Sequence, residues 1–431
     1  MVIRGESRSG KIDALTGLRF WAATLIVAEH ASMLRVPLPA WGYDHGVSLF
    51  FVLSGFILAH VYPRLDDWRS TCRFLVLRVA RIWPAHAAVL VLWLAAIGGS
   101  IFSAKFFANL LMIHAWIPSA PWYFSFNAPS WSISTEFFFY LAFPFLILGW
   151  RRSWVWKWLG AVGLLSAMIV IGAWARLPGY SPEDIVTVHG LIYVGPLGRI
   201  LEFVTGMVAY SCFAALRPRA RRLGLVTGSL LEIGVIAAAV YSIIDAPLFR
   251  WASGRFGLTG LDEWLAHCGS LPVFPILIVV LALRSGVISR FLGSRPIVLL
   301  GEVSYSIYLV HMGVYAVYVQ HWMPAGLQPD YAGLAICLVV VLALSFAIWR
   351  LIETPIRQAA RRAVDASALR QSLPSCRLRH FAAVGENDGI WKDAGAKVRR
   401  DVPDVADSDE AGVRWAKSAR SCGGRSRSGR A

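Results

Sequence analysis

The sequence is dominated by apolar blocks of roughly 20 residues that alternate with short polar connections. A helix of this length matches the hydrocarbon core of a membrane, and an ordinary soluble enzyme would not carry so many such blocks. The chain is therefore predicted to be all-α, a polytopic bundle of about ten transmembrane helices. The apolar blocks lie near 14–34, 46–63, 74–98, 130–149, 154–175, 188–215, 224–244, 270–284, 297–320 and 332–353.

The connections between the blocks carry charge in an alternating pattern. Every second connection is rich in arginine, starting with Arg64, Arg69 and Arg73, whereas the connections between them hold only scattered cations. Loops rich in Lys and Arg stay in the cytoplasm, so the alternation predicts an even number of spans with both termini on that side. The formal net charge of +16 is then a topology signal and a means of contacting anionic lipid, and we expect no nucleic-acid partner.

Composition divides the chain into three parts. We predict a cytoplasmic N-terminal segment at 1–12, an integral membrane domain at 13–358, and a basic, disordered cytoplasmic tail at 359–431. The longest outer connection, 245–269, is either a cap over a cavity or a solvated loop. Histidines in or near loops, His189 and His267 among them, are not expected to be functional. The cysteines show no paired spacing, and the sequence indicates no metal site.

The first block places two ionisable side chains in one membrane helix. Arg19 and His30 are eleven residues apart, which puts them on one helical face and about 16 Å apart along the axis. An ionisable residue inside a span normally faces a cavity or a partner. This helix is therefore predicted to form a wall of a polar channel, with Arg19 near the cytoplasmic end and a titratable imidazole near the outer end.

The third and fourth blocks add further polar groups at membrane depth. Arg78 and Arg81 share a face near the cytoplasmic end of their helix, where they suit a phosphate-bearing ligand, although lipid headgroups could occupy them instead. Glu136 is expected close to the depth of His30, with Ser132 four residues earlier on the same face. A carboxylate beside an imidazole fixes its tautomer; the alternative is a structural pair between Glu136 and an arginine.

Two later blocks supply possible cavity-lining residues. Arg199 and Glu202 are three residues apart, so a mutual salt bridge is expected whatever else they do. The block near 297–320 has a polar stripe that ends in a mid-membrane imidazole, His311, which either lines a cavity or is a satisfied core residue. The remaining polar residues of that stripe that we assign to the cavity are Ser304 and Tyr305.

Six blocks in order resemble the acyltransferase-3 family of integral membrane acyltransferases. The resemblance runs from Asp13 to about Arg357, and it includes the family's first-helix pattern of an Arg, ten residues and a His. The blocks read LTGLRFWAATLIVAEH, GVSLFFVLSGFILA, FLVLRVARIWPAH, PSWSISTEFFFY, LGEVSYSIYLVH and RLIETPIR. Family patterns often have a second acid or Gln after the Glu of the fourth block, whereas Phe137 follows Glu136 here.

The resemblance implies an O-acyltransferase of a bacterial inner membrane. Its members move acyl groups, often acetyl, from cytoplasmic acyl-CoA to hydroxyls on glycans or other acceptors, and no cofactor stays bound. It implies that His30 is the catalytic histidine, that Glu136 supports it, and that Arg19, Arg78 and Arg81 hold the donor. Many members also carry a periplasmic hydrolase-like domain; we expect the stand-alone type here, with membrane lipid around it.

Two questions stay open at this stage. His30 either deprotonates the acceptor hydroxyl or takes the acyl group itself, and the sequence does not separate these routes. A transporter or flippase of a glycan or lipid-linked intermediate also suits a bundle with buried ionisable residues. The lack of interrupted half-helices and of a repeat between the two halves argues against that class, and a membrane anchor explains neither the histidines nor the acids. The acceptor and the oligomeric state are not defined by the sequence.

Overall fold

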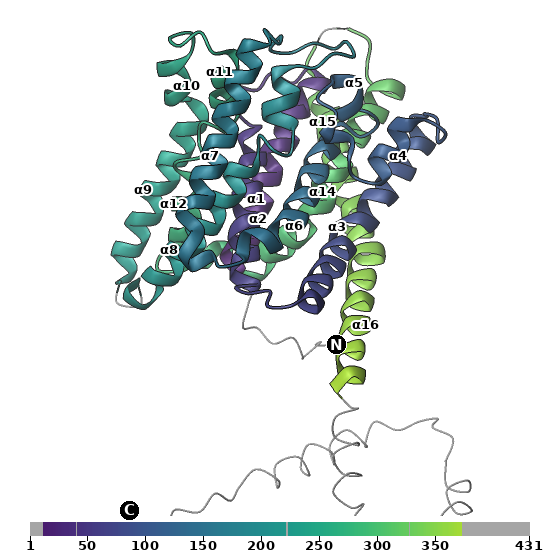
Figure 1. The fold of residues 1–431 in the computed structure, drawn as a ribbon. Helices are drawn as coiled ribbons and strands as arrows, with labels where there is room; N and C mark the ends of the chain where they lie inside the picture. Colours follow the sequence, from purple (N-terminus) through teal and green to yellow (C-terminus); the bar gives the residue numbers. More distant parts are fainter. Residues whose placement is uncertain (1–11, 40, 221–222, 327, 373–431) are drawn as a thin grey trace, which may run out of the picture. The chain divides into compact units, whose positions relative to one another are not determined.

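The computed structural model describes residues 12–39, 41–220, 223–326 and 328–372, and within these ranges the chain is helical with no strand. This confirms the predicted all-α class. Each of the ten apolar blocks contains one α-helix, and Figure 1 labels these helices in the bundle. These helices are α1 (Asp13–Glu29), α2 (His45–Val61), α3 (Trp68–Ala96), α6 (Trp131–Ile147), α7 (Trp150–Trp174), α8 (Ile200–Ala220), α9 (Leu225–Ile244), α12 (Phe274–Leu283), α14 (Arg295–His321) and α15 (Tyr331–Ile348).

Among the described residues, seven helices are long and apolar enough to cross a membrane. They are α3, α6 with the turn before it, α7, α8, α9, α14, and α15 with its continuation. Helices α1 and α2 have 17 residues each, about 25 Å, and α12 has ten, about 15 Å. The number of spans therefore stays a prediction, since three of the apolar blocks form helices shorter than a full span.

Short helical segments fill the connections. Between α3 and α6 lie α4 (Ala104–Leu110), η3 (His114–Trp116), α5 (Ala120–Tyr123) and η4 (Ala128–Ser130); before α8 lies the π-helix η5 (His189–Val194). The connection 245–269 forms α10 (Pro247–Ala252) and α11 (Thr259–Cys268), and α13 (Val287–Leu292) precedes α14. Figure 1 shows α5, α10 and α11 at one end of the bundle, which we call the α11 end.

The chain divides into two units after residue 366, and of the second unit only residues 367–372 are described. After α15, the π-helix η6 (Trp349–Glu353) leads into α16 (Thr354–Ser372), which passes the boundary predicted at residue 358. Residues 359–372 of the predicted tail are therefore helical. The remainder of that tail, and residues 1–11 of the predicted N-terminal segment, lie outside the described residues.

Close glycine contacts hold the central helices together. A methyl group added at Gly206 of α8 would lie 2.0 Å from the backbone oxygen of Val52 in α2, and one added at Gly301 of α14 would lie 1.9 Å from that of Thr16 in α1. Small residues let helix backbones approach this closely in a membrane, where no hydrophobic force drives helices together. These contacts pair α2 with α8 and α1 with α14, and they fix the helices that carry the predicted site.

The end of α1 positions the predicted catalytic histidine. The α-helix stops at Glu29, and the chain tightens into the 3-10 turn η2 (His30–Leu34), which ends at Arg35 in the left-handed region with φ 59°. A 3-10 turn is common at the end of an α-helix. His30 is thus the first residue beyond the regular helix, close to where α2 begins at the α11 end.

Candidate active site

A cavity lies between α1, α2, α3, α6 and α14. One face of α2 lines it from Val47 to Leu58, a run of twelve residues that extends about 16 Å along the helix axis. The cavity is therefore long and narrow, which suits an extended ligand. The α2 residues in the lining are Val47, Phe50, Phe51, Leu53, Ser54, Ile57 and Leu58.

Three of the predicted arginines meet in this cavity. Arg19 comes from α1, while Arg78 and Arg81 come from α3, and Glu136 is the carboxylate that lies with them in the lining. Arg78 donates a hydrogen bond to the Tyr62 hydroxyl at 3.1 Å. In the described part of the chain, neither Arg19 nor Arg81 makes a hydrogen bond or an ion pair. A guanidinium group held inside a bundle without a hydrogen bond or an ion pair is costly, so the cavity is suited to an anionic ligand.

The polar residues of α6 also reach the cavity. Glu136 accepts a short hydrogen bond from the Tyr140 hydroxyl, one helical turn further on. The Ser132 hydroxyl lies 2.6 Å from the Tyr308 hydroxyl, and both residues belong to the lining. The sequence predicts that Glu136 supports the imidazole of His30, and this stays a prediction; in the structure its carboxylate lies in the lining together with the three arginines.

His30 pairs with the other mid-membrane histidine. His311 Nε2 lies 3.2 Å from His30 Nδ1, and the ring centroids are 5.1 Å apart. His30 Nδ1 also lies 2.9 Å from the Ile26 carbonyl oxygen, and His311 Nδ1 lies 2.7 Å from that of Tyr308. Because a carbonyl oxygen only accepts, these partners assign a proton to Nδ1 of each ring. His30 Nε2 then keeps its lone pair, as a base or nucleophile requires.

The histidine pair connects to the cavity through α14. Tyr308 lines the cavity with its side chain, and its backbone carbonyl accepts from His311. His311 is fully buried, and His30 is half-buried. Neither ring belongs to the lining residues of the cavity. Tyr308 was not singled out in the sequence, although it lies three residues before His311 on the same helical face.

Of the other residues predicted to line the cavity, only Tyr305 does so, and the rest make contacts within the bundle. Arg199 and Glu202 form a fully buried ion pair with Nε and Oε1 2.8 Å apart, as expected, but they do not line the cavity. Ser304 also lies outside the lining and donates to the Gly301 carbonyl at 2.8 Å. Tyr305 does belong to the lining, and its hydroxyl donates to the Ile82 carbonyl at 2.8 Å.

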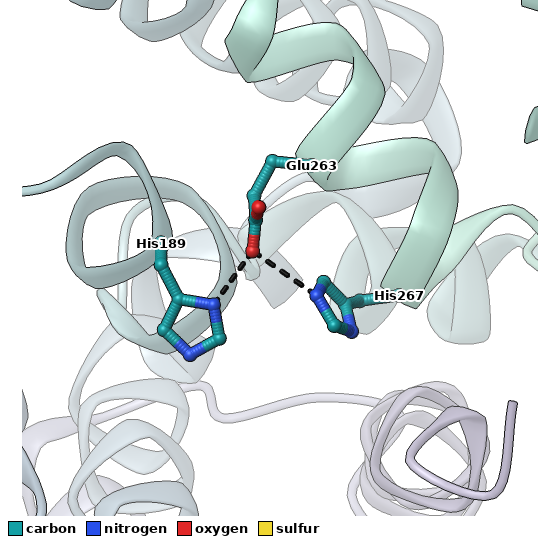
Figure 2. A group of neighbouring side chains, drawn as sticks. All are labelled: His189, Glu263 and His267. Atoms are coloured by element: carbon teal, nitrogen blue, oxygen red, sulfur yellow. Dashed lines mark hydrogen bonds and ion pairs between the residues drawn. The ribbon is translucent and has the colours of Figure 1, made fainter. Parts of the chain in front are cut away.

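A second cluster of titratable side chains lies at the α11 end (Figure 2). Glu263 Oε1 lies 2.6 Å from His189 Nδ1 and 3.1 Å from His267 Nε2, while His267 Nδ1 makes a short contact with Asp44. Burial disfavours the protonated form of His267 and so lowers its pKa, but the hydrogen bonds to Asp44 and Glu263 have the larger effect and raise the pKa of His267 to about 9. Burial acts against ionisation of Glu263 too, yet hydrogen bonds from the two histidines lower its pKa to about 2.

Little in the sequence connects these residues. The sequence predicts that His189 and His267 are loop histidines without a functional role, and the segments that carry them are far apart in the chain. One local signal was present, because Glu263 and His267 are four residues apart and share a face of α11.

Comparison with known proteins identifies the family. A family model described as an acyltransferase domain matches residues 12–350. The acyltransferase MdmB of Streptomyces mycarofaciens is 29% identical over 336 residues, which cover 70% of this chain and 79% of that protein. Nodulation protein 10 of Rhizobium leguminosarum bv. viciae is 26% identical over 422 residues, 86% of this chain and 98% of that protein.

A third relative is longer than this chain. The O-acetyltransferase OatA of Staphylococcus aureus (strain NCTC 8325 / PS 47) is 24% identical over 379 residues, which cover 80% of this chain but only 57% of OatA. No solved structure matches this one.

Membrane-length helices around a charged cavity, together with these matches, define an integral membrane enzyme that transfers acyl groups to oxygen. The chain belongs to the acyltransferase-3 family, since the family model covers most of its length. The resemblance drawn from six sequence blocks is thereby confirmed.

Proposed function

We propose that this acyltransferase takes an acyl group, acetyl first of all, from cytoplasmic acyl-CoA and transfers it to a hydroxyl of a cell-surface or exported glycan. The observation that carries the proposal is the narrow cavity in which Arg19, Arg78 and Arg81 converge against one carboxylate, Glu136. We further propose a bacterial inner membrane as its location, with the arginine end of the cavity facing the cytoplasm.

The donor fits the cavity by charge and by shape. The phosphates of CoA are anionic, and arginine binds phosphate through two parallel hydrogen bonds. In the described part of the chain, Arg19 and Arg81 make no hydrogen bond or ion pair, so they can bind phosphate without breaking one. The thin arm that carries the thioester would then extend along the lining face of α2 towards Ser132 and Tyr308.

The transfer step would take place at His30 Nε2. In the general-base route, Nε2 takes the proton of the acceptor hydroxyl and the oxygen attacks the thioester carbonyl. The C–S bond then breaks, and Nε2 passes the proton to the leaving sulfur, which releases the CoA thiol. In the covalent route, Nε2 attacks the thioester carbonyl and the C–S bond breaks to release the CoA thiolate. The acceptor oxygen then attacks the acyl-imidazolium, the bond from Nε2 to the acyl carbon breaks, and the hydroxyl proton passes to the thiolate. Both routes need the lone pair that the hydrogen bonds at Nδ1 leave on Nε2.

The nature of the acceptor follows from the family rather than from the cavity. Known members acylate hydroxyls of glycans, and the relative from Staphylococcus aureus is named an O-acetyltransferase. An acetyl group and a hydroxyl acceptor are therefore the first pair to test.

The test uses full-length protein in proteoliposomes with acetyl-CoA and cell-surface polysaccharide. We expect release of the CoA thiol that depends on polysaccharide, and ester signals in its NMR spectrum. His30→Ala is expected to abolish both, while the matched change His321→Ala, at the far end of α14, leaves them unchanged. An acyl-protein adduct that disappears in His30→Ala would select the covalent route. Movement of glycan without thioester consumption would show a transporter instead.

A further inference from the structure

We propose that His189, Glu263 and His267 bind a divalent transition-metal ion at the α11 end, with Zn²⁺ the best chemical match. The three residues offer two imidazole nitrogens and one carboxylate oxygen, and these ligand atoms all lie within 4.8 Å of one another. Imidazole nitrogen with carboxylate oxygen is a common ligand set for zinc, and two His with one Glu occur together in zinc enzymes.

Two of the three separations between ligand atoms can be compared with what a tetrahedral ion needs, and the third, between the two histidines, is within 4.8 Å. Zn²⁺ binds nitrogen and oxygen at about 2.0–2.1 Å, so neighbouring ligand atoms in a tetrahedron are about 3.3 Å apart. The separation of 3.1 Å between His267 Nε2 and Glu263 Oε1 is close to this value. The separation of 2.6 Å between His189 Nδ1 and Glu263 Oε1 has to widen by about 0.7 Å, which a rotation of the Glu263 side chain can supply.

The surroundings hold both rings in place. His267 turns Nε2 towards Glu263 because its other nitrogen, Nδ1, donates to the Asp44 carboxylate. A carboxylate that accepts from the far nitrogen of a metal-binding histidine is the usual outer partner in zinc sites. The Tyr193 ring packs against both imidazoles, with centroids 4.9 Å from His189 and 4.4 Å from His267. Rings positioned in this way need little reorganisation to bind an ion.

A metal ion here would tie three distant segments together. His189 belongs to η5, Glu263 and His267 belong to α11, and Asp44 directly precedes α2. The ion would hold the connection 245–269 against the bundle, close to the start of the helix that lines the cavity. Three protein ligands leave the fourth tetrahedral position to water or to an acceptor group. The site is separate from the cavity lining, so this inference does not depend on the proposed acyl donor.

Titration of the purified full-length protein with Co²⁺, a coloured substitute for Zn²⁺, tests the inference. The protein is purified through a tag without histidine and freed of metal with EDTA. We expect a single bound ion with the strong visible absorption of tetrahedral Co²⁺, displaced by Zn²⁺. Glu263→Gln and His267→Gln should weaken binding by at least about 100-fold, and Asp44→Asn by about 10- to 100-fold. His321→Gln is the matched control and should bind as the parent protein does.

The parent protein decides the outcome even if a variant fails to fold. If it takes up neither Co²⁺ nor Zn²⁺ at micromolar concentrations, the cluster is only an ion-pair network and the proposal is wrong. Equal Co²⁺ binding by a monodisperse His267→Gln protein would also overturn it, because the ion would then sit elsewhere.

Discussion

Replacing His311 should slow acyl transfer without weakening donor binding. The N–H group at His30 Nδ1 is shared between the Ile26 carbonyl oxygen and His311 Nε2, which lies 3.2 Å away. The hydrogen bond to His311 therefore helps to hold the His30 ring with the lone pair of its own Nε2 free. Phenylalanine fills the same buried space but cannot accept that bond. A neutral hydrogen bond is worth about 0.5–1.5 kcal/mol net, which corresponds to a fall in kcat of about 2- to 13-fold. The KM for acetyl-CoA should stay constant, because His311 does not line the cavity in which Arg19, Arg78 and Arg81 lie.

The assay measures kcat and KM by release of the CoA thiol in proteoliposomes, with the unfolding temperature as a check on folding. His311→Gln is the conservative control: its amide oxygen can accept from His30 Nδ1, so its kcat should lie closer to the parent than that of His311→Phe. If His311→Phe retained full activity, the positioning effect would be absent. A complete loss that matched His30→Ala would mean that His311 itself carries out the chemistry.

The other predictions concern donor binding and helix packing. Arg81→Gln should raise the KM for acetyl-CoA by about 10- to 150-fold with kcat retained, because this factor corresponds to the free energy of one hydrogen bond to a charged group. The control variant Arg255→Gln, in the connection before α11, should leave the KM unchanged. Gly206→Ala should destabilise the protein by about 1–3 kcal/mol, because the added methyl group would lie 2.0 Å from a backbone oxygen. Gly234→Ala, which meets nothing within 4 Å, should keep the parent unfolding temperature in detergent, and an equal loss in both variants would refute the packing explanation.

Much of the fold could be predicted because a membrane imposes one length scale on the chain. Each apolar block of the sequence contains a helix, from α1 to α15. Helix length was harder to predict. The block near 188–215 divides into the π-helix η5 and α8, and the block near 270–284 yields only the ten residues of α12. Hydropathy counts apolar residues, but it does not show where backbone hydrogen bonding is interrupted.

The candidate site was predictable where helical spacing was enough. Arg78 and Arg81 share a face of α3, so their arrival in one cavity follows from a single helix. The partner of His30 could not be found in this way, because His311 is 281 residues away in the chain and only the packing of α1 against α14 brings the rings together. The cluster at the α11 end was missed for the same reason, as His189 and Glu263 come from separate connections.

The most direct test is a cryo-EM structure of the protein with a non-hydrolysable thioether analogue of acetyl-CoA. The analogue's phosphates should lie within hydrogen-bonding distance of Arg19, Arg78 or Arg81, with its arm along the lining face of α2. Its carbonyl carbon, or an acceptor oxygen beside it, should come within about 3–3.5 Å of His30 Nε2, the separation that a reacting pair requires. An analogue bound outside this cavity, or one whose acyl end points away from His30, would contradict the account.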